Sequence, residues 1–516
     1  MAFHQNSHIL GDVYSGAGFI ALLNELEEKI RPERCVVDGL NFWPVLRFEI
    51  NYYRKTRKSE RREAPIDFVV PPLKKRWKMW RARGVAVQPQ VTIDAVQKAR
   101  LEVLPRADVM FANSAGQYLH TISGYAIQPF TDGLQYLLPT NDTRHLTIVN
   151  KDPRRTGEDF LISPHVLPLE GIKLARHLKR PKHHVDAVAQ QTVLKKVQKV
   201  NKILSIYAPD LVLDEGRCLQ RVQSALMYTS YFDLVLEKVR PKVIFMGSFT
   251  GSHYICAAGK RRGIPVVDIQ HGGMHAHHPI AANWHRVPRG GYELLPDVFW
   301  CWSQRTADLI AATLSPAHGT VVGGNPKTAF ERAWFSSDQS EQPPVGRAQV
   351  LVALQYGGDK LIQPHILDAF RQTRNDIDWH FRMHPIGWGR KDEAVKTLGI
   401  DEADLVKSSR LPLQNQLMQM DLLLTNMSTI VHDACDIGLP AGVCADEGAA
   451  FFDDLLKSGA IRHLRDLDEI CATIHDLDLS CQARQIRRDR ASALGQAAAA
   501  EVKAGYDAIL AQCGAR

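Results

Sequence analysis

The stretch Gly263-Ile-Pro-Val-Val-Asp-Ile-Gln-His-Gly-Gly273 indicates an α/β fold with a site at the end of a strand. Its mostly apolar residues 265–269 lead directly into a polar turn that carries Gln270 and His271. A buried parallel strand has this pattern when it presents side chains at its carboxyl end. Because ligands of open α/β sheets bind at that edge, we expect His271 at the floor of a cleft between two domains.

The residues before this stretch complete a βαβ unit. Residues 241–246 predict a strand, 247–251 a glycine-containing loop and 252–262 a helix. With the strand at 264–269 they have the length of about 30 residues expected of a parallel crossover. The loop precedes the amino end of a helix, where backbone N–H groups can hold an anion. It lacks the lysine of a P-loop and the full dinucleotide fingerprint, so it is a weak phosphate signal.

The same alternation of strands and helices recurs along the chain and predicts parallel sheets with helices on their faces. The other predicted strands are 34–38, 66–70, 107–112, 296–302, 318–327, 348–354, 378–383 and 421–425. The other predicted helices include 41–53, 92–104, 185–207, 219–239, 362–373 and the alanine-rich 491–511.

The length predicts two domains, because 516 residues exceed what one hydrophobic core usually serves. The composition, 45% hydrophobic and 23% charged, is typical of a soluble globular protein. We expect an α/β fold with two Rossmann-like parallel-sheet domains, at 1–292 and 293–480, facing across a cleft. The link is placed at Arg289-Gly-Gly-Tyr292, and the carboxy-terminal helices at 481–516 are expected to pack back on the first domain.

The cysteines and the amino terminus predict a cytoplasmic protein. The nine cysteines are scattered and form no CxxC pair, which favours reduced thiols over a disulfide framework or a zinc site. The first eight residues lack the basic-then-apolar order of a signal peptide. The chain also has no uninterrupted apolar run of about 18 residues, the minimum for a membrane-spanning helix.

The net charge of +8 is unevenly distributed. Residues 54–62 and 74–83 are strongly basic, and the second segment interleaves Trp77 and Trp80 with its cations. Residues 74–83 are therefore candidates for peripheral contact with the anionic inner membrane face, and a solvated helix face is the equally weighted alternative. No DNA-binding or RNA-binding module accompanies the charge, so we expect no nucleic-acid partner.

Three short motifs at the carboxyl ends of predicted strands are the candidates for chemistry. The first is Gln270-His271-Gly272. The second is Arg382-Met-His384-Pro385, in which the proline ends the strand where the arginine and histidine project. The third is Asn426-Met-Ser428-Thr429, whose hydroxyls can cap the next helix and leave its amino end to hold phosphate. Asp433 falls on the same helix face one turn later, suitably placed for a ribose hydroxyl.

These motifs resemble those of glycosyltransferases of the GT-B fold. The resemblance is carried by Gly324-Asn325-Pro326, by residues 382–385, by Ser428, Thr429 and Asp433, and by Gly438-Leu-Pro440. It covers roughly residues 240–445 and is similar to bacterial capsule and surface-polysaccharide enzymes, including Kdo-transferase-like and sialyltransferase-like families that use CMP-sugars. The Gln-His-Gly turn is also similar to the His-Gly of teichoic-acid glycerophosphotransferases.

The resemblance implies roles for the matching residues. Arg382 and His384 meet the nucleotide phosphate, Ser428 and Thr429 a phosphate oxygen, and Asp433 the ribose, although the family more commonly has glutamate there. His271 is either the base for the acceptor hydroxyl or a phosphate contact. The further binding candidates are Gln270, Gly272 and Asn325. The resemblance also implies that the first domain binds a glycan or lipid-linked acceptor and the second a nucleotide-sugar donor.

Alternative bases and alternative functions remain open at this point. An acidic-acidic-Gly motif holds the catalytic group in some bacterial sialyltransferases, and Asp214-Glu215-Gly216 and Asp446-Glu447-Gly448 both match it. We favour Asp214 and Glu215 because they belong to the expected acceptor domain. A metal site in the histidine-rich loop 271–285 lacks acidic or cysteine partners nearby, and we expect no metal and no cofactor. The rival functions are a sugar-nucleotide epimerase, a glycerophosphotransferase-like enzyme and a non-catalytic scaffold of a polysaccharide assembly complex.

Overall fold

The computed structural model describes most of the chain. The described residues are 12–60, 91–114, 118, 120–122, 125–138, 143–150, 159–167, 169, 172–174, 184–335, 346–355 and 360–514. The predicted strand at 66–70 and the basic segment at 74–83 lie outside them.

The first structural unit is built on a parallel sheet of seven strands in the order β14-β13-β12-β11-β4-β7-β9. The predicted βαβ unit is at its centre, since β11 pairs in parallel with β12 in the register Ile244↔Val266. The strands are β4 (Val109–Asn113), β7 (His145–Val149), β9 (His165–Val166), β11 (Val243–Met246), β12 (Val266–Ile269), β13 (Val298–Cys301) and β14 (Gly319–Val322).

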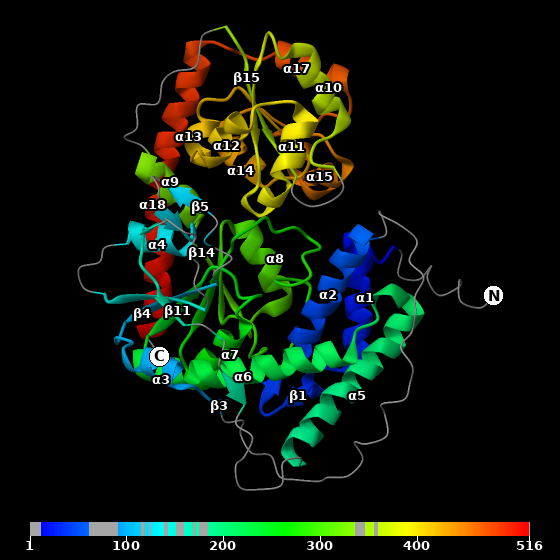
Figure 1. Cartoon of the computed structure of the whole chain (residues 1–516), viewed down its shortest axis with the longest axis vertical. Helices are drawn as coiled ribbons and strands as arrows, with labels where there is room; N and C mark the ends of the chain where they lie inside the picture. The colour runs from blue at the N-terminus through cyan, green and yellow to red at the C-terminus, as the bar shows by residue number, and fades with distance from the viewer. Residues whose placement is uncertain are drawn as a thin grey trace, which may run out of the picture.

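The second unit is built on a parallel sheet of five strands in the order β16-β15-β17-β18-β19. Its strands are β15 (Gln349–Ala353), β16 (Asp378–Arg382), β17 (Leu422–Thr425), β18 (Ala441–Val443) and β19 (Arg462–His463). The predicted fold class is thereby confirmed: the chain is α/β with two Rossmann-like parallel sheets, as expected of a GT-B-like protein, and the two units lie one above the other in Figure 1.

Both faces of each sheet are buried, which explains the near-continuous apolar runs of the strands. In β11, Ile244 and Met246 pack into one cluster while Val243 and Phe245 pack into another on the opposite face. The first cluster includes residues of α1 (Gly16–Ile30), α2 (Trp43–Glu60), α5 (His184–Tyr207), α6 (Glu215–Val239) and α7 (His253–Arg262). The second includes residues of α4 (Thr131–Leu137), α9 (Pro326–Phe335) and α18 (Cys481–Gly514).

The remaining elements are short or cover the second sheet. The second unit carries α10 (Pro364–Thr373), α11 (Lys391–Leu398), α12 (Glu402–Arg410), α13 (Leu413–Leu417), α14 (Ile430–Ile437), α15 (Asp446–Phe451), α16 (Asp453–Lys457) and α17 (Leu467–His475). The first unit also has α3 (Ala95–Glu102) and α8 (Gln304–Leu314). Small two- and three-stranded sheets pair β1 (Val36–Val37) with β2 (Leu40–Asn41), β3 (Val91–Thr92) with β10 (Lys173–Leu174), and β6 (Tyr125–Ile127) with β5 (His120–Ile122) and β8 (Asp159–Phe160).

One strand joins a different sheet from the one expected. The segment 296–302 was predicted to enter the second domain, but its strand β13 pairs in parallel with β12 in the register Val267↔Val298. The following strand β14 pairs with β13 and forms the edge of the same sheet. The chain therefore passes from the first sheet to the second after β14, and the domain boundary at 292/293 stays a prediction that does not coincide with the change of sheet. The predicted strand at 34–38 is likewise different, since β1 belongs to an antiparallel hairpin with β2.

The long helix α18 joins the two units. Near its start, Arg484 and Arg487 form ion pairs with Asp421, directly before β17 of the second sheet. Near its end, Val502 and Tyr506 pack in the buried cluster under the first sheet. Figure 1 shows this helix running along one side of both units, next to α9.

Candidate functional site

The loop after β12 touches the second unit. A Cβ atom added at Gly273 would lie 2.9 Å from Thr429 Cγ2 and 3.1 Å from Phe451 Cζ. The ring of His275 packs against that of Phe451, with centroids 5.0 Å apart. Two of the predicted motifs, at 270–272 and 426–429, are therefore neighbours across the junction between the two units.

We predict that Gly273→Ala destabilises the protein by about 1–3 kcal/mol, the usual range for an overpacked contact. The added methyl group must displace Thr429 or the ring of Phe451. Gly272→Ala is the matched control, because a Cβ there meets nothing within 4 Å. Thermal and denaturant unfolding of both variants checks the prediction. Equal effects of the two substitutions would show that the close approach at Gly273 is not maintained in solution.

Two buried polar side chains fix the strand ends next to this loop. Gln270 Nε2 donates to the carbonyl oxygen of Gly272 at 2.9 Å, and its Oε1 accepts from the backbone N–H of Trp302 at 2.8 Å. Asp268 Oδ1 accepts from the N–H of Phe249 at 2.7 Å, and burial raises its pKa to about 8. Gln270 thus ties the turn to the end of β13, a positioning function, and Asp268 holds the loop after β11. The sequence feature that could have marked Asp268 is its position as an acidic residue inside an apolar strand.

His271 projects from the turn and is exposed to solvent. Nevertheless, desolvation by the surrounding protein, together with the positive charge of Lys55, lowers the pKa of its imidazole. An imidazole with a lowered pKa is mostly neutral at neutral pH. The ring therefore has the free lone pair that a general base requires.

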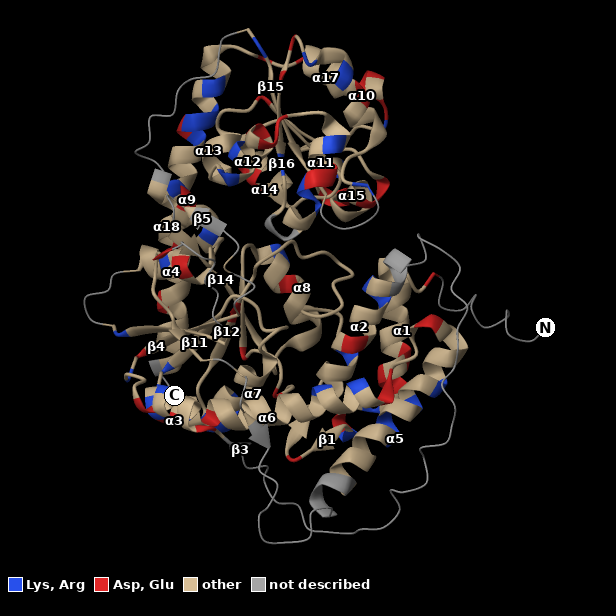
Figure 2. Ribbon diagram, in the orientation of Figure 1, with Lys and Arg blue, Asp and Glu red and all other residues tan. Residues whose placement is uncertain are grey.

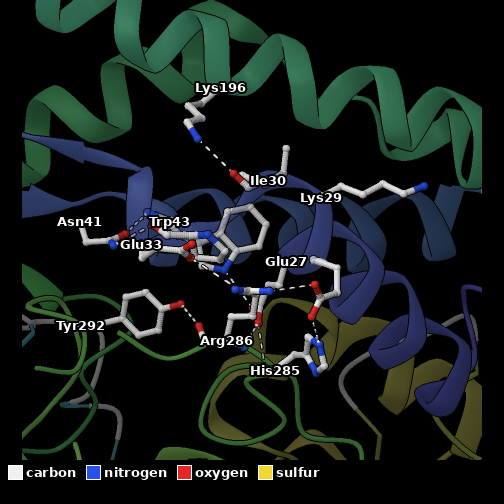
Figure 3. A network of polar contacts seen from close by, with 12 residues as sticks. Glu27, Lys29, Ile30, Glu33, Asn41, Trp43, Lys196, His285, Arg286 and Tyr292 are labelled. Carbon is white, nitrogen blue, oxygen red and sulfur yellow. Dashed lines mark hydrogen bonds and ion pairs between the residues drawn. The ribbon is translucent and has the colours of Figure 1, made fainter. Parts of the chain in front are cut away.

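A buried network centred on Glu27 anchors the histidine-rich loop to α1 and α2 (Figure 3). The carboxylate of Glu27 accepts from Trp43 Nε1 at 2.9 Å and from the backbone N–H groups of His285 and Arg286, each at 2.8 Å. It also forms an ion pair with Arg47, and both side chains are fully buried.

Arg47 also holds the histidine-rich loop, through hydrogen bonds to its backbone carbonyl oxygens. Its guanidinium donates to the carbonyl oxygen of Pro279 at 2.8 Å and to that of Asn283 at 2.7 Å. The guanidinium also lies over the ring of Trp284, 4.2 Å from the centroid. Burial lowers the pKa of Arg47 and Glu27 opposes that effect. The loop that carries the candidate histidines is thus held by buried charged hydrogen bonds.

On the second unit, Arg382 is held at the end of β16. Its Nη1 donates to the carbonyl oxygens of Ser408 and Leu411, at 3.1 and 2.7 Å, and to Gln416 Oε1 at 2.9 Å. Burial lowers its pKa to about 10, while Glu331 and Asp433 act in the opposite direction. The guanidinium therefore remains charged at neutral pH, with one nitrogen committed to the carboxyl end of α12.

His384 lies close to two cations. Its pKa is lowered to about 4 by burial and by the positive charges of Lys327 and Arg382. Lys327 comes from α9, and its Nζ lies 3.7 Å from Glu331 Oε1. Glu331 is buried, its pKa is raised by desolvation, and its Oε2 has no hydrogen-bond partner among the described residues. Lys327 and Glu331 therefore join the predicted Arg382 and His384 in one cluster.

Lys327 and Glu331 belong to none of the motifs recognisable in the sequence. Both follow the Gly-Gly-Asn-Pro turn on α9 and are spaced four residues apart, a common pattern on exposed helices. Only the folded chain places them near the end of β16, where Glu331 acts on the pKa of Arg382 and Lys327 on that of His384.

Asp433 and Asn325 have local structural partners. Asp433 Oδ1 accepts from Thr328 Oγ1 at 2.9 Å and from Gln414 Nε2 at 2.8 Å, which connects α14 to α9 and α13. Asn325 Oδ1 accepts from the N–H of Lys327 at 3.2 Å at the start of α9. The ribose contact of Asp433 stays a prediction, and one oxygen of its carboxylate already has two donors.

The amino end of α14 has little capping by side chains. Thr429 occupies the cap position without a side-chain cap hydrogen bond, and Ser428 Oγ lies 3.5 Å from the N–H of Ile430. The expected cap is therefore weak at Ser428 and not made by Thr429. The N–H groups of Val431 and His432 already donate to the carbonyl oxygens of Ser428 and Thr429, at 3.2 and 3.0 Å, so the N–H of Ile430 is the weakly engaged donor at this helix end.

Asp214 and Glu215 lie at the amino end of α6, on the first unit. Asp214 Oδ1 caps this helix by accepting from the N–H of Arg217 at 2.6 Å, and Glu215 Oε2 accepts from Gln198 Nε2 at 3.0 Å. Among the described residues, neither carboxylate contacts His271 or the second unit. Their assignment as alternative bases stays a prediction.

In the part of the chain that the structure describes, no group of three or more His, Cys, Asp or Glu side chains is arranged to hold a metal ion. None of the described helices combines the length and hydrophobicity that crossing a membrane requires.

No protein-family model and no curated protein matches this chain. Several solved structures resemble it at low identity. A UDP-N-acetylglucosamine 2-epimerase is 13% identical with a TM-score of 0.44, and the alignment covers 80% of this chain and 98% of that one. The UDP-GlcNAc 2-epimerase from Neisseria meningitidis bound to UDP-GlcNAc is 12% identical with a TM-score of 0.41, covering 77% and 98%.

The calicheamicin glycosyltransferase CalG4 is 14% identical with a TM-score of 0.40, covering 80% of this chain and 99% of that one. At these identities and TM-scores, the likenesses support no assignment of substrate or reaction. The fold class follows from the two parallel sheets of this chain.

Proposed function

We propose that this protein is a glycosyltransferase that moves a sugar from a nucleotide-activated donor to a glycan or lipid-linked acceptor in bacterial surface polysaccharide synthesis. The observation that carries the proposal is the cluster of Lys327, Arg382 and His384 at the end of β16. It combines two cations and a neutral imidazole, with Asp433 linking α9 to the weakly capped helix α14.

This cluster suits the phosphate groups of a leaving nucleotide. Departure of a nucleotide from an anomeric carbon leaves negative charge on its phosphate, and preorganised donors stabilise that charge. Arg382 and Lys327 supply positive charge, while His384 supplies a neutral N–H donor. An arriving phosphate also offsets the two cations that lower the pKa of His384, so nucleotide binding raises that pKa. The Kdo-like and sialyl-like motifs favour a CMP-sugar, and UDP-sugars and GDP-sugars are the next candidates.

His271 is proposed as the base for the acceptor hydroxyl. It belongs to the opposite unit from Arg382 and His384, in the turn whose next residue, Gly273, contacts Thr429. Its lowered pKa keeps it able to accept a proton at neutral pH. General-base catalysis of this kind typically contributes about 10²–10⁴-fold to the rate. The enzyme is proposed to act in the cytoplasm, with residues 74–83 contacting the inner membrane face.

A thermal-shift screen against CMP, CDP, UDP and GDP tests the nucleotide site. We expect at least one nucleotide to raise the melting temperature, since a ligand at 100 times its Kd stabilises the native state by about 2.7 kcal/mol. Lys327→Ala and His384→Ala should each reduce that shift. Lys391→Ala is the matched control, because its ammonium pairs on the surface with Glu402 and is not part of the cluster. If no nucleotide shifts the wild-type protein, the proposal fails.

The product of the reaction separates the proposal from its rivals. Conversion of a UDP-sugar to an epimer without any acceptor would identify an epimerase. Transfer of glycerol phosphate would identify the glycerophosphotransferase-like activity. A scaffold would keep its function after His271→Ala and His384→Ala, whereas the transferase loses activity.

A further inference from the structure

A second group of cations lies on the first unit, at the carboxyl end of α2 and in the histidine loop. Arg54 and Lys55 come from α2, and His271, His275 and His278 come from the loop after β12. We call these five residues the α2–histidine face. The rings of His275 and His278 are 5.9 Å apart, and Lys55 acts electrostatically on all three histidines.

The charged groups that act on these imidazoles are cations. Burial lowers the pKa of His275 to about 4, with smaller contributions from His277, Arg54 and Lys55. Burial, His275, Lys55, His271 and Arg47 lower that of His278 to about 3. The imidazoles are thus neutral N–H donors beside Arg54 and Lys55, whose own pKa values burial lowers.

The amino end of α1 adds to the positive potential of this face. A Cβ atom at Gly16, the first residue of α1, would lie 2.9 Å from His277 Cβ. The first turn of α1 contains no acidic residue and Ser15 caps it, while Asp12, three residues before the cap, accepts from the N–H of Tyr14 at 2.9 Å. The helix dipole therefore contributes partial positive charge where the histidine loop passes.

Arg54 and Lys55 have no acidic partner among the described residues. Arg54 Nη1 donates to the carbonyl oxygen of Tyr14 at 3.4 Å, its guanidinium lies 4.3 Å from the ring centroid of Phe19, and its buried Nε has no partner there. Lys55 is exposed. Figure 2 shows blue residues on the described part of α2 towards the side of the first unit that faces the second.

Three of the four acidic residues of α15 and α16, the two helices that approach through Phe451, pair with other cations. Asp446 lies 3.5 Å from His463 Nε2, and Asp453 lies 2.6 Å from Lys457 Nζ. Asp454 forms an ion pair with Arg305. The charge of the α2–histidine face is therefore not balanced by these carboxylates.

We propose that the α2–histidine face binds a phosphate or diphosphate group, at a site separate from the Lys327 cluster. Arg54 and Lys55 supply the charge, and the neutral histidines supply N–H donors, a combination that suits a phosphate with several acceptor oxygens. The anion site follows from these residues alone. That the phosphate belongs to the acceptor, for example as a lipid-linked diphosphate, rests on the proposed function.

Titration of the full-length protein with inorganic pyrophosphate tests the site. The experiment uses the Lys327→Ala/His384→Ala background, so that the nucleotide cluster does not contribute. We expect saturable binding that weakens with salt. Lys55→Glu changes the local charge by two units, from positive to negative, and should weaken binding more than roughly tenfold, since even in bulk water one charge at about 4 Å changes affinity several-fold. Because Lys55 is exposed, the substitution leaves the core intact.

Controls separate this site from general charge effects. Lys391→Glu changes the net charge equally on α11 of the second unit and should leave pyrophosphate binding unchanged. His275→Asn should weaken binding while keeping a polar side chain. Binding that survives Lys55→Glu, or that is absent in the Lys327→Ala/His384→Ala background, overturns the proposal.

Two vesicle arms distinguish the source of the phosphate. The protein should bind phosphatidylcholine vesicles that contain a polyprenyl diphosphate, and Lys55→Glu should weaken that binding. Any binding to phosphatidylglycerol vesicles should be the same with and without the Lys55→Glu substitution. Lys55-dependent binding to phosphatidylglycerol vesicles, without binding of pyrophosphate, would overturn the proposal in favour of a membrane-contact surface. Failure of the nucleotide screen with retained pyrophosphate binding would reject the proposed function but not this site.

Discussion

Glu27→Ala is expected to lower the free energy of unfolding by about 3–5 kcal/mol, because it leaves the guanidinium of Arg47 buried without its counter-charge. The same substitution removes the acceptor for Trp43 Nε1 and for the N–H groups of His285 and Arg286. Thermal and denaturant unfolding measure the loss. The histidine loop should also become more susceptible to proteolysis, since its backbone loses two buried hydrogen bonds.

Glu28→Ala is the matched control for this prediction. The neighbouring carboxylate contacts the same two residues, with His285 Nε2 at 2.6 Å and Arg286 Nη1 at 2.8 Å, but it is exposed. Exposed ion pairs contribute about 0–1 kcal/mol, so the control should change stability little. Similar losses in the two variants would contradict the central role of the buried network.

Asp421→Ala is the second substitution with a large expected effect. Asp421 Oδ2 lies 2.5 Å from Arg484 Nη2 and Oδ1 lies 2.7 Å from Arg487 Nη2, and all three side chains are buried. The substitution leaves two buried guanidinium groups without an acid, at a cost of about 3–5 kcal/mol. It also removes the acceptor for the N–H of Gln349 in β15.

Calorimetry is the appropriate measurement because a two-unit protein need not unfold in one step. We expect the transition of the second unit to shift to lower temperature, while that of the first unit changes less. Asp453→Ala removes an exposed partner of Lys457 and serves as the control. A single transition shifted equally in both variants would argue that Asp421 does not hold α18 in place.

Local patterns predicted much of the fold. The βαβ unit at β11, α7 and β12 was predictable because the apolar strands, the glycine loop and the helix are continuous in sequence. The sheet that β13 joins was not, because a strand looks the same whichever sheet it pairs with, and pairing is a long-range property. The link at Arg289-Gly-Gly-Tyr292 suggested a boundary where the chain merely turns back to the same sheet.

The candidate site was predictable in part. The motifs marked where strands end, and the contact of Gly273 with Thr429 shows two of these ends meeting. The sequence did not reveal which polar groups already have partners inside the fold. Gln270 uses both ends of its amide in hydrogen bonds, and Asp433 connects three helices. In the sequence, the spacing of Lys327 and Glu331 is that of an ordinary exposed ion pair. Only the fold places their charges close to those of Arg382 and His384.

The position of α9 and α18 has a consequence for how the two units can move. The helices cross between the units on one side, and they pack closely, since a Cβ at Gly495 would lie 2.9 Å from Arg332 Cβ (Figure 1). The contact between His275 and Phe451 is made instead by loops and short elements. Small-angle scattering with and without nucleotide would report movement between the units. We expect a rotation whose axis lies along the α9–α18 side, so that the phosphate cluster and the α2–histidine face are exposed and enclosed together.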